Sequence, residues 1–282
     1  MTKVPRVLVF DSGVGGLSVG ACVRQQLPGA ELVYLADNAG FPYGDQPEPV
    51  VIERCCRLIG YALAQYAPEV IVVACNTAST VVLPHLRSMT DVPVVGVVPA
   101  IKPAAARTVN RRIGVLATPA TIRRPYLDDL VQEFAGHCLV ERIGHPGLVR
   151  WVEESVGGQE IPRAELAAAV AAFRAAGVDT VVLGCTHYPL LLGALREVLP
   201  EVVHWVDSGE AIARRVGQLL AGLNKGESAT APAASDQPPV LAALFSGPAP
   251  AGLTDFMAKL GLAPTAVLGN WPDSGVPATA AG

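Results

Sequence analysis

Short runs of β-branched and other apolar residues alternate along the chain with longer helix-like stretches, and this alternation constrains the fold most strongly. Strands joined by helical crossovers pair in parallel, because a tight hairpin cannot connect parallel neighbours. We therefore predict an α/β fold with mainly parallel sheets flanked by helices. The predicted strands are Val7–Phe10, Leu32–Leu35, Val70–Ala74, Ile113–Ala117, Leu139–Ile143 and Thr180–Leu183. The predicted helices are Leu17–Pro28, Pro49–Tyr66, Thr121–Phe134, Arg163–Ala176 and a long helix with Ser208 as its N-cap.

The strands form two series that resemble each other. Each series begins with a strand that ends in a polar turn, at Asp11 in one and Thr118 in the other. Each later has an apolar strand that stops at a cysteine followed by polar residues, first Cys75 and then Cys185. Any α/β chain offers some parallels of this kind. The pattern nevertheless favours two similar lobes related by a rough twofold axis.

Composition excludes several classes of protein. The 282 residues are 51% hydrophobic and 16% charged, which favours a packed core over global disorder. A formal net charge of −4 gives no basic surface of the kind that binds nucleic acid. The N-terminus lacks a signal-peptide pattern, and no apolar run approaches the roughly 20 residues that cross a bilayer. We therefore expect a cytoplasmic protein without membrane contact.

Two C-terminal segments differ in composition from the rest. Residues 224–239 are rich in Lys, Glu, Ser, Ala and Pro, which is typical of a linker-like insert. Residues 269–282 are predicted to form a disordered tail.

The six cysteines are expected to be reduced thiols in a cytoplasmic protein. None of them forms a CxxC pair, and zinc-ligand spacing is absent, so no metal site is expected. Cys75 and Cys185 both follow a strand and precede a helix, where free backbone N–H groups favour an anion such as a thiolate. Ligands of parallel sheets bind at this edge. A single cysteine at a strand end is more often a small buried residue, but two in matched settings indicate function.

A pair of opposed thiols suits the inversion of a stereocentre. That reaction needs a base on one face of the carbon and an acid on the other, and a thiol serves as either. Asp11 and His187 lie near the two turns and are suited to orient or tune the thiols, although a turn residue and a structural histidine are the simpler interpretations. A pyridoxal phosphate mechanism is disfavoured, because only Lys102 lies near a plausible site and no phosphate loop surrounds it.

The motifs resemble those of glutamate racemase, in the aspartate/glutamate racemase superfamily. The matching segments span about residues 7–220 in the family's order, and the two cysteine motifs are the most specific. They are Phe10-Asp11-Ser12-Gly13-Val14-Gly15-Gly16-Leu17, Asp37 with Pro42-Tyr43-Gly44, Ala74-Cys75-Asn76-Thr77-Ala78-Ser79, Leu183-Gly184-Cys185-Thr186-His187-Tyr188-Pro189-Leu190 and Val206-Asp207-Ser208-Gly209.

The resemblance implies interconversion of L- and D-glutamate without metal or pyridoxal phosphate, supplying D-glutamate for peptidoglycan. It implies an active site between one lobe of residues 1–97 plus 208–268 and another of residues 98–207. Cys75 would act as the base on one enantiomer and Cys185 on the other. Asp11 would support Cys75, while His187 and Glu153, or the neighbouring Glu154, would support Cys185. The residues that resemble substrate contacts are Asp11, Ser12, Pro42, Tyr43, Gly44, Asn76, Thr77, Thr118, Thr121 and Thr186.

The sequence departs from the family at two places. Asn38-Ala39-Gly40 stands where the family usually has Thr-Ala-Arg, and Pro125 replaces a more usual serine. A homodimer is usual in the family. Two alternative functions stay open: an aspartate racemase, and a racemase-fold protein that acts mainly by binding a partner such as DNA gyrase. The intact cysteine pair favours chemistry, and the complete run from Cys185 to Leu190 favours glutamate.

Overall fold

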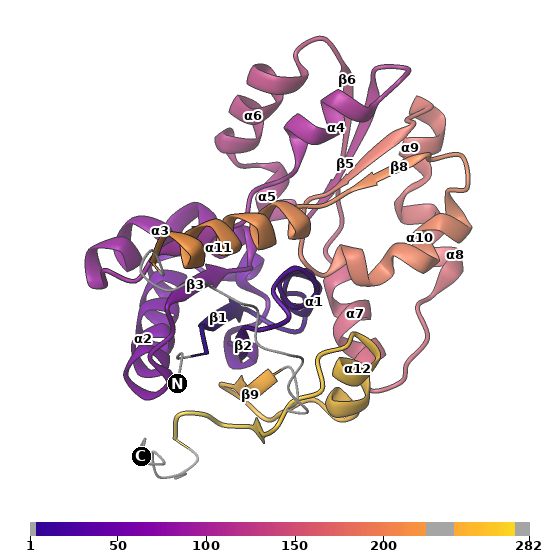
Figure 1. The fold of residues 1–282 in the computed structure, drawn as a ribbon. Coiled ribbons are helices and arrows are strands. Elements are labelled where there is room, and N and C mark those ends of the chain that lie inside the picture. The colour runs from indigo at the N-terminus through magenta and orange to yellow at the C-terminus, as the bar shows by residue number, and fades with distance from the viewer. Residues whose placement is uncertain (1–3, 224–239, 274–282) are drawn as a thin grey trace.

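The computed structural model describes residues 4–223 and 240–273, which form two parallel β-sheets flanked by helices (Figure 1). All paired strands run parallel, so the predicted α/β fold is confirmed. The first sheet has the order β10-β9-β2-β1-β3-β4, with β1 Arg6–Asp11, β2 Glu31–Ala36, β3 Val70–Val73, β4 Val94–Gly96, β9 Val240–Phe245 and β10 Val267–Leu268. The second has the order β6-β5-β7-β8, with β5 Arg112–Ala117, β6 Leu139–Gly144, β7 Thr180–Leu183 and β8 His204–Val206.

The two sheets share a strand order. The neighbouring strands β2-β1-β3-β4 of the first sheet correspond to β6-β5-β7-β8 of the second, because each group places its first strand along the chain between its second and third. Cys75 stands two residues after the end of β3, and Cys185 stands two residues after the end of the equivalent strand β7. The topology therefore supports the repeat that the sequence indicates.

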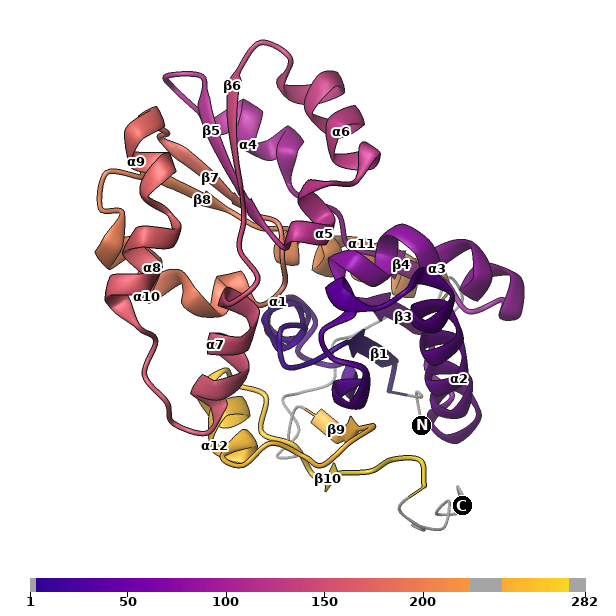
Figure 2. The same ribbon diagram turned by 180° about the vertical axis from the view of Figure 1, so that it is seen from behind.

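Helices cover both faces of each sheet (Figures 1 and 2). In β1, Val7 and Val9 pack towards α1 (Leu17–Gln26) and α11 (Gly209–Leu223), whereas Leu8 and Phe10 pack towards α2 (Glu48–Tyr66) and α3 (Asn76–Met89), as expected for a strand buried on both faces. The helices are α1 Leu17–Gln26, α2 Glu48–Tyr66, α3 Asn76–Met89, α4 Ile101–Arg107, α5 Pro119–Ile122, α6 Pro125–Ala135, α7 Leu148–Val156, α8 Arg163–Ala169, α9 Ala171–Ala176, α10 Leu192–Val198, α11 Gly209–Leu223 and α12 Leu253–Lys259; short 3₁₀ helices span Asn38–Gly40, Tyr43–Asp45 and Tyr188–Leu191.

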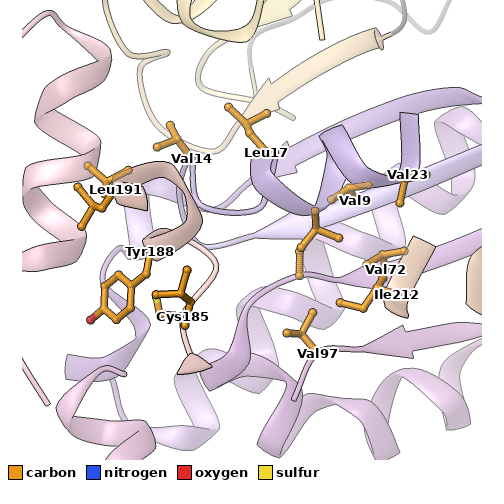
Figure 3. Packing of buried hydrophobic residues seen from close by; sticks show 14 of the residues in the cluster. Val9, Val14, Leu17, Val23, Val72, Val97, Cys185, Tyr188, Leu191 and Ile212 are labelled. Atoms are coloured by element: carbon orange, nitrogen blue, oxygen red, sulfur yellow. The ribbon is translucent and has the colours of Figure 1, made fainter. Parts of the chain in front are cut away.

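One buried cluster joins the two sheets (Figure 3). It extends from Val9 and Val72 of the first sheet through Val14 to Cys185 and Tyr188, beyond the end of β7. The turns that follow β1 and β7 are therefore packed against each other, and side chains from both sheets hold them in place.

The chain crosses between the sheets after β4 and again after β8, and the two crossings are tied together. The Ser208 hydroxyl donates a hydrogen bond to the Val98 carbonyl. Ser208 directly precedes the long helix α11, as predicted, but its side chain bonds to Val98 and does not cap the helix. Asp207 takes this role instead, because its Oδ1 accepts the N–H of Gly209, the first residue of α11, at 2.7 Å.

Two predicted helices are divided. The helix predicted over Thr121–Phe134 breaks into α5 and α6 at Arg124, which is extended (φ −77°, ψ 129°) because the following Pro125 disfavours helical geometry there. The helix predicted over Arg163–Ala176 divides at Val170, where ψ is 8°.

The predicted disorder of residues 269–282 does not hold for residues 269–273. Trp271 is buried, its N–H donates to the Phe245 carbonyl at 2.9 Å, and its Nε1 donates to Gln65 Oε1 at 3.2 Å. The remainder of that segment, and the predicted insert 224–239, lie outside the described residues. Within the described ranges, none of the helices has the length and apolar character needed to cross a membrane.

Candidate active site

A pocket opens at the carboxyl ends of the strands, between the two sheets. All the residues with a predicted substrate contact line it, as do Cys75, Cys185 and His187. They come from the ends of β1, β3, β5 and β7 and from the loop after β2, which is where parallel sheets place their ligands. Glu153 does not line the pocket and lies behind His187.

Cys75 occupies the N-cap position of α3 and is almost completely buried. Its sulfur lies 3.8 Å from the Ser12 hydroxyl, which belongs to the turn after β1. Burial raises the pKa of the Cys75 thiol well above its usual value, and the nearby Asp11 carboxylate adds to the rise. The thiol form is therefore favoured.

Asp11 organises the turn after β1. Its carboxylate is fully buried and accepts the backbone N–H of Ser12 at 2.8 Å, the N–H of Gly16, and the Thr186 hydroxyl at 3.3 Å. Burial raises the pKa of Asp11, although the positive charge of His187 and the two backbone N–H groups oppose the rise. Through Thr186, Asp11 links the first sheet to the cysteine turn of the second.

Cys185, His187 and Glu153 form a chain of contacts. His187 Nδ1 lies 3.7 Å from Cys185 Sγ, and Nε2 lies 2.7 Å from Glu153 Oε1. Burial lowers the pKa of His187, but its hydrogen bonds to Cys185 and Glu153 outweigh burial and raise the pKa well above its usual value. These two contacts therefore favour the protonated form of the imidazole. Of the two neighbouring glutamates, Glu153 makes this contact, whereas Glu154 is exposed.

Two glycines of the turn after β1 allow this chain to approach the first sheet. A Cβ atom on Gly13 would lie 2.0 Å from Glu153 Oε1, and one on Gly15 would lie 2.3 Å from His187 Nδ1. The neighbouring Val14 donates its N–H to Glu153 Oε1 at 2.7 Å. The glycines are thus required by close packing against the imidazole and carboxylate, a role that sequence analysis did not identify.

The arrangement places two thiols from equivalent strands in one pocket, with the carboxyl group of Asp11 near one and the imidazole of His187 near the other. The model of the Asp/Glu/Hydantoin racemase family matches residues 18–216, more than half of the chain. The chain belongs to the Asp/Glu/hydantoin racemase family. The family model therefore confirms the resemblance seen in the sequence motifs.

Named relatives within this racemase family are glutamate racemases. The enzyme of Shewanella loihica is 49% identical over 221 residues, covering 78% of this chain and 83% of the relative. That of Proteus mirabilis is 48% identical over 227 residues, covering 79% of each. The crystal structure of Escherichia coli glutamate racemase in complex with L-glutamate and the activator UDP-MurNAc-Ala has a TM-score of 0.83 and 41% identity, over 95% of this chain and 99% of that one.

A buried ion pair holds the loop after β2 in this racemase. Asp37 accepts two hydrogen bonds of 2.6 Å from Arg54, one of 2.6 Å from the Tyr43 hydroxyl and one of 2.5 Å from Ser246. Burial acts to raise the pKa of Asp37, but these hydrogen bonds and the charge of Arg54 outweigh it and lower the pKa. The network fixes the side of the pocket formed by Pro42, Tyr43 and Gly44.

The same network explains one departure from the family pattern. A Cβ atom on Gly40 would lie 2.6 Å from Arg54 Nε and 2.7 Å from Asp37 Oδ2. The guanidinium of Arg54, supplied by α2, therefore occupies the space beside Gly40. The sequence around residues 38–40 contains no pattern that identifies Arg54 as the ion-pair partner of Asp37.

The racemase pocket includes residues that sequence analysis missed. The Phe41 ring lies 5.8 Å from the His187 ring, centroid to centroid. His145 directly follows β6, so the rule that ligands bind at strand ends was sufficient to find it. The remaining members are Asp45, Pro119, Ala120, Arg123, Pro146 and Val149. Among the described residues, no cluster of His, Cys, Asp or Glu is arranged to hold a metal ion.

Proposed function

We propose that this enzyme is a glutamate racemase, which interconverts L- and D-glutamate by proton transfer between Cys75 and Cys185. The observation that carries the proposal is that two thiols, from equivalent strand ends of two sheets, line a single pocket. The thiolate of one cysteine removes the Cα proton, and the thiol of the other donates its proton to the opposite face of the carbanion. Both electrons of the broken C–H bond stay on carbon and form the new one, so the reaction needs no oxidant.

The surrounding groups fit an amino dicarboxylate. Ser12, Thr77, Thr118, Thr121 and Thr186 offer hydroxyl donors to carboxylates. Asn76 Oδ1 is buried without a hydrogen-bond partner among the described residues, which leaves an acceptor for the substrate ammonium. These polar groups bind the substrate by hydrogen bonds and fix Cα between the sulfurs.

The auxiliary residues act through the thiols. His187, held by Glu153, presents a proton donor to the Cys185 sulfur and stabilises the charge that forms when Cys185 acts as the base. Asp11 and Ser12 position the Cys75 side of the pocket. The thiols supply both acid and base, so this mechanism uses no pyridoxal phosphate or metal.

The substrate assignment follows from the relatives, which are glutamate racemases. The D-glutamate produced would serve peptidoglycan synthesis. A homodimer, a cytoplasmic location and binding to DNA gyrase stay predictions, and no feature of the described residues favours gyrase over catalysis.

Circular dichroism of the purified protein in D₂O, with EDTA and no added pyridoxal phosphate, tests the proposal. The L-glutamate signal is expected to decay to zero while deuterium appears at Cα. If L-aspartate is racemised instead, the substrate assignment is wrong. If neither amino acid changes, the enzyme proposal fails and a binding role gains support.

A further inference from the structure

Arg123 lines the pocket, and two further arginines, Arg124 and Arg150, each follow a lining residue in the chain and are paired. Arg124 bonds to Glu48, and Arg150 lies 3.7 Å from Asp45. Each pair joins an element that follows the second sheet's strands to one that follows β2 of the first sheet. These two guanidinium groups are therefore neutralised locally.

The third arginine, Arg123, is exposed and also lines the pocket. Within the described ranges its side chain has no hydrogen bond or ion pair. It follows α5 directly and so shares a turn with Thr118 and Thr121, which line the same wall. Its backbone is thereby held beside the pocket, and its guanidinium has no partner among the described residues.

The other charged groups of the lining are balanced or neutral. His187 is paired with Glu153, and Asp45 with Arg150. Burial lowers the pKa of His145, and its Nδ1 accepts the Gly147 N–H at 3.1 Å, so this imidazole is neutral at pH 7. Among the described residues of the lining, Arg123 is therefore the cation without an ion-pair partner. The remaining acidic group, Asp11, is fully buried.

A substrate with two carboxylates and one ammonium group carries a net charge of −1, and it approaches a chain whose formal net charge is −4. Long-range repulsion therefore opposes entry, whereas a local cation at the mouth raises the concentration of the anion there. We propose that Arg123 is a capture residue, which attracts the dicarboxylate into the pocket without taking part in proton transfer. This inference rests on the proposed function.

The test compares Arg123→Gln, Arg123→Lys and the wild type at salt concentrations from about 10 mM to about 1 M, because salt screens a charge–charge attraction over this range. Arg107→Gln is the matched control. Arg107 is exposed, has no ion pair among the described residues and precedes Thr108, whose hydroxyl bonds to Asp179 at the amino end of β7, away from the pocket.

We expect Arg123→Gln to lower kcat/KM by about three- to tenfold at low salt through KM, with kcat within about twofold of wild type. The difference should vanish at high salt, Arg123→Lys should keep most of the effect, and Arg107→Gln should behave as wild type. An unchanged kcat/KM at low salt, or an equal loss in kcat that salt does not alter, would overturn the inference. Racemisation by the wild type in the same assay separates this failure from failure of the proposed function.

Discussion

Gly15 and His187 lie in turns that follow strands of different sheets, yet a single methyl group on Gly15 would lie 2.3 Å from His187 Nδ1. The side chain that contacts the Cys185 sulfur is therefore positioned by a glycine that follows β1. The turn that carries Cys185 is tied to the first half of the fold a second time, because the Thr186 hydroxyl bonds to Asp11.

Substitution of Gly15 by alanine is predicted to displace the imidazole. We expect a loss of at least about 100-fold in kcat/KM, since small misplacements at a reacting centre are costly, and destabilisation by about 1–3 kcal/mol from overpacking. Racemisation rates and urea unfolding measure the two effects. Gly60→Ala is the control, because its Cβ would meet no atom within 4 Å. Equal behaviour of the two variants would contradict the packing argument.

Glu153→Gln tests the link between His187 and stability. The folded-state pKa of His187 is raised, so its contribution to stability is complete below the unfolded pKa of about 6.5 and is lost as pH rises through the folded value. The free energy of unfolding of the wild type should therefore exceed that of Glu153→Gln most at pH 6, and the gap should narrow as pH rises. Chemical denaturation between pH 6 and 9 measures it. A difference that widens with pH would refute the pairing of Glu153 with a protonated His187. Glu154→Gln should show no pH-dependent difference from the wild type.

Asp37→Asn is predicted to loosen the loop that carries Tyr43. Removing one partner of a buried ion pair costs about 3 kcal/mol, and KM should rise because the pocket wall moves. The folded pKa of Asp37 is lowered, so its contribution is present above the unfolded pKa of about 3.9 and is lost as pH falls through the folded value. The wild type and the variant should thus converge in stability in acid.

The exposed pair of Asp128 and Arg142 provides the control for this substitution. Asp128→Asn should cost less than about 1 kcal/mol, as surface ion pairs do. If the Asp37 variant costs no more than that, or if its deficit persists unchanged at pH 3, the buried network does not hold the loop.

The central strands were predictable because strands of a parallel sheet are buried on both faces and form continuous apolar runs, as in Val70–Val73. The order of the strands within each sheet was harder to predict from the sequence. β9 pairs with β2 across more than 200 residues of sequence, and its run Val240–Phe245 has a composition equally suited to a helix. The division of the helix at Arg124 was signalled locally by Pro125.

For the site, strand ends predicted which polar groups meet, since Asp11 and Cys75 lie at the carboxyl ends of strands in the first sheet, and Thr118 and Cys185 lie at the carboxyl ends of strands in the second. Their supporting partners were not predictable by this rule. Ser246 lies 209 positions from Asp37 in the sequence, and neither residue carries a local signal of the contact.

In the two-base mechanism, the two cysteines remove the proton from opposite enantiomers. Cys75→Ser and Cys185→Ser should each nearly abolish racemisation, because a serine hydroxyl is too weak an acid to take the role of the thiol. Each variant keeps one thiol and should still remove the proton from one enantiomer. Cys138→Ser, which alters a thiol outside the pocket lining, should retain wild-type activity.

The most direct test follows Cα–H exchange by proton NMR in D₂O for each variant with L- and with D-glutamate. We expect exchange without inversion, confined to one enantiomer in Cys75→Ser and to the other enantiomer in Cys185→Ser. Racemisation by Cys185→Ser at the wild-type rate, or exchange of the same enantiomer by both variants, would contradict it.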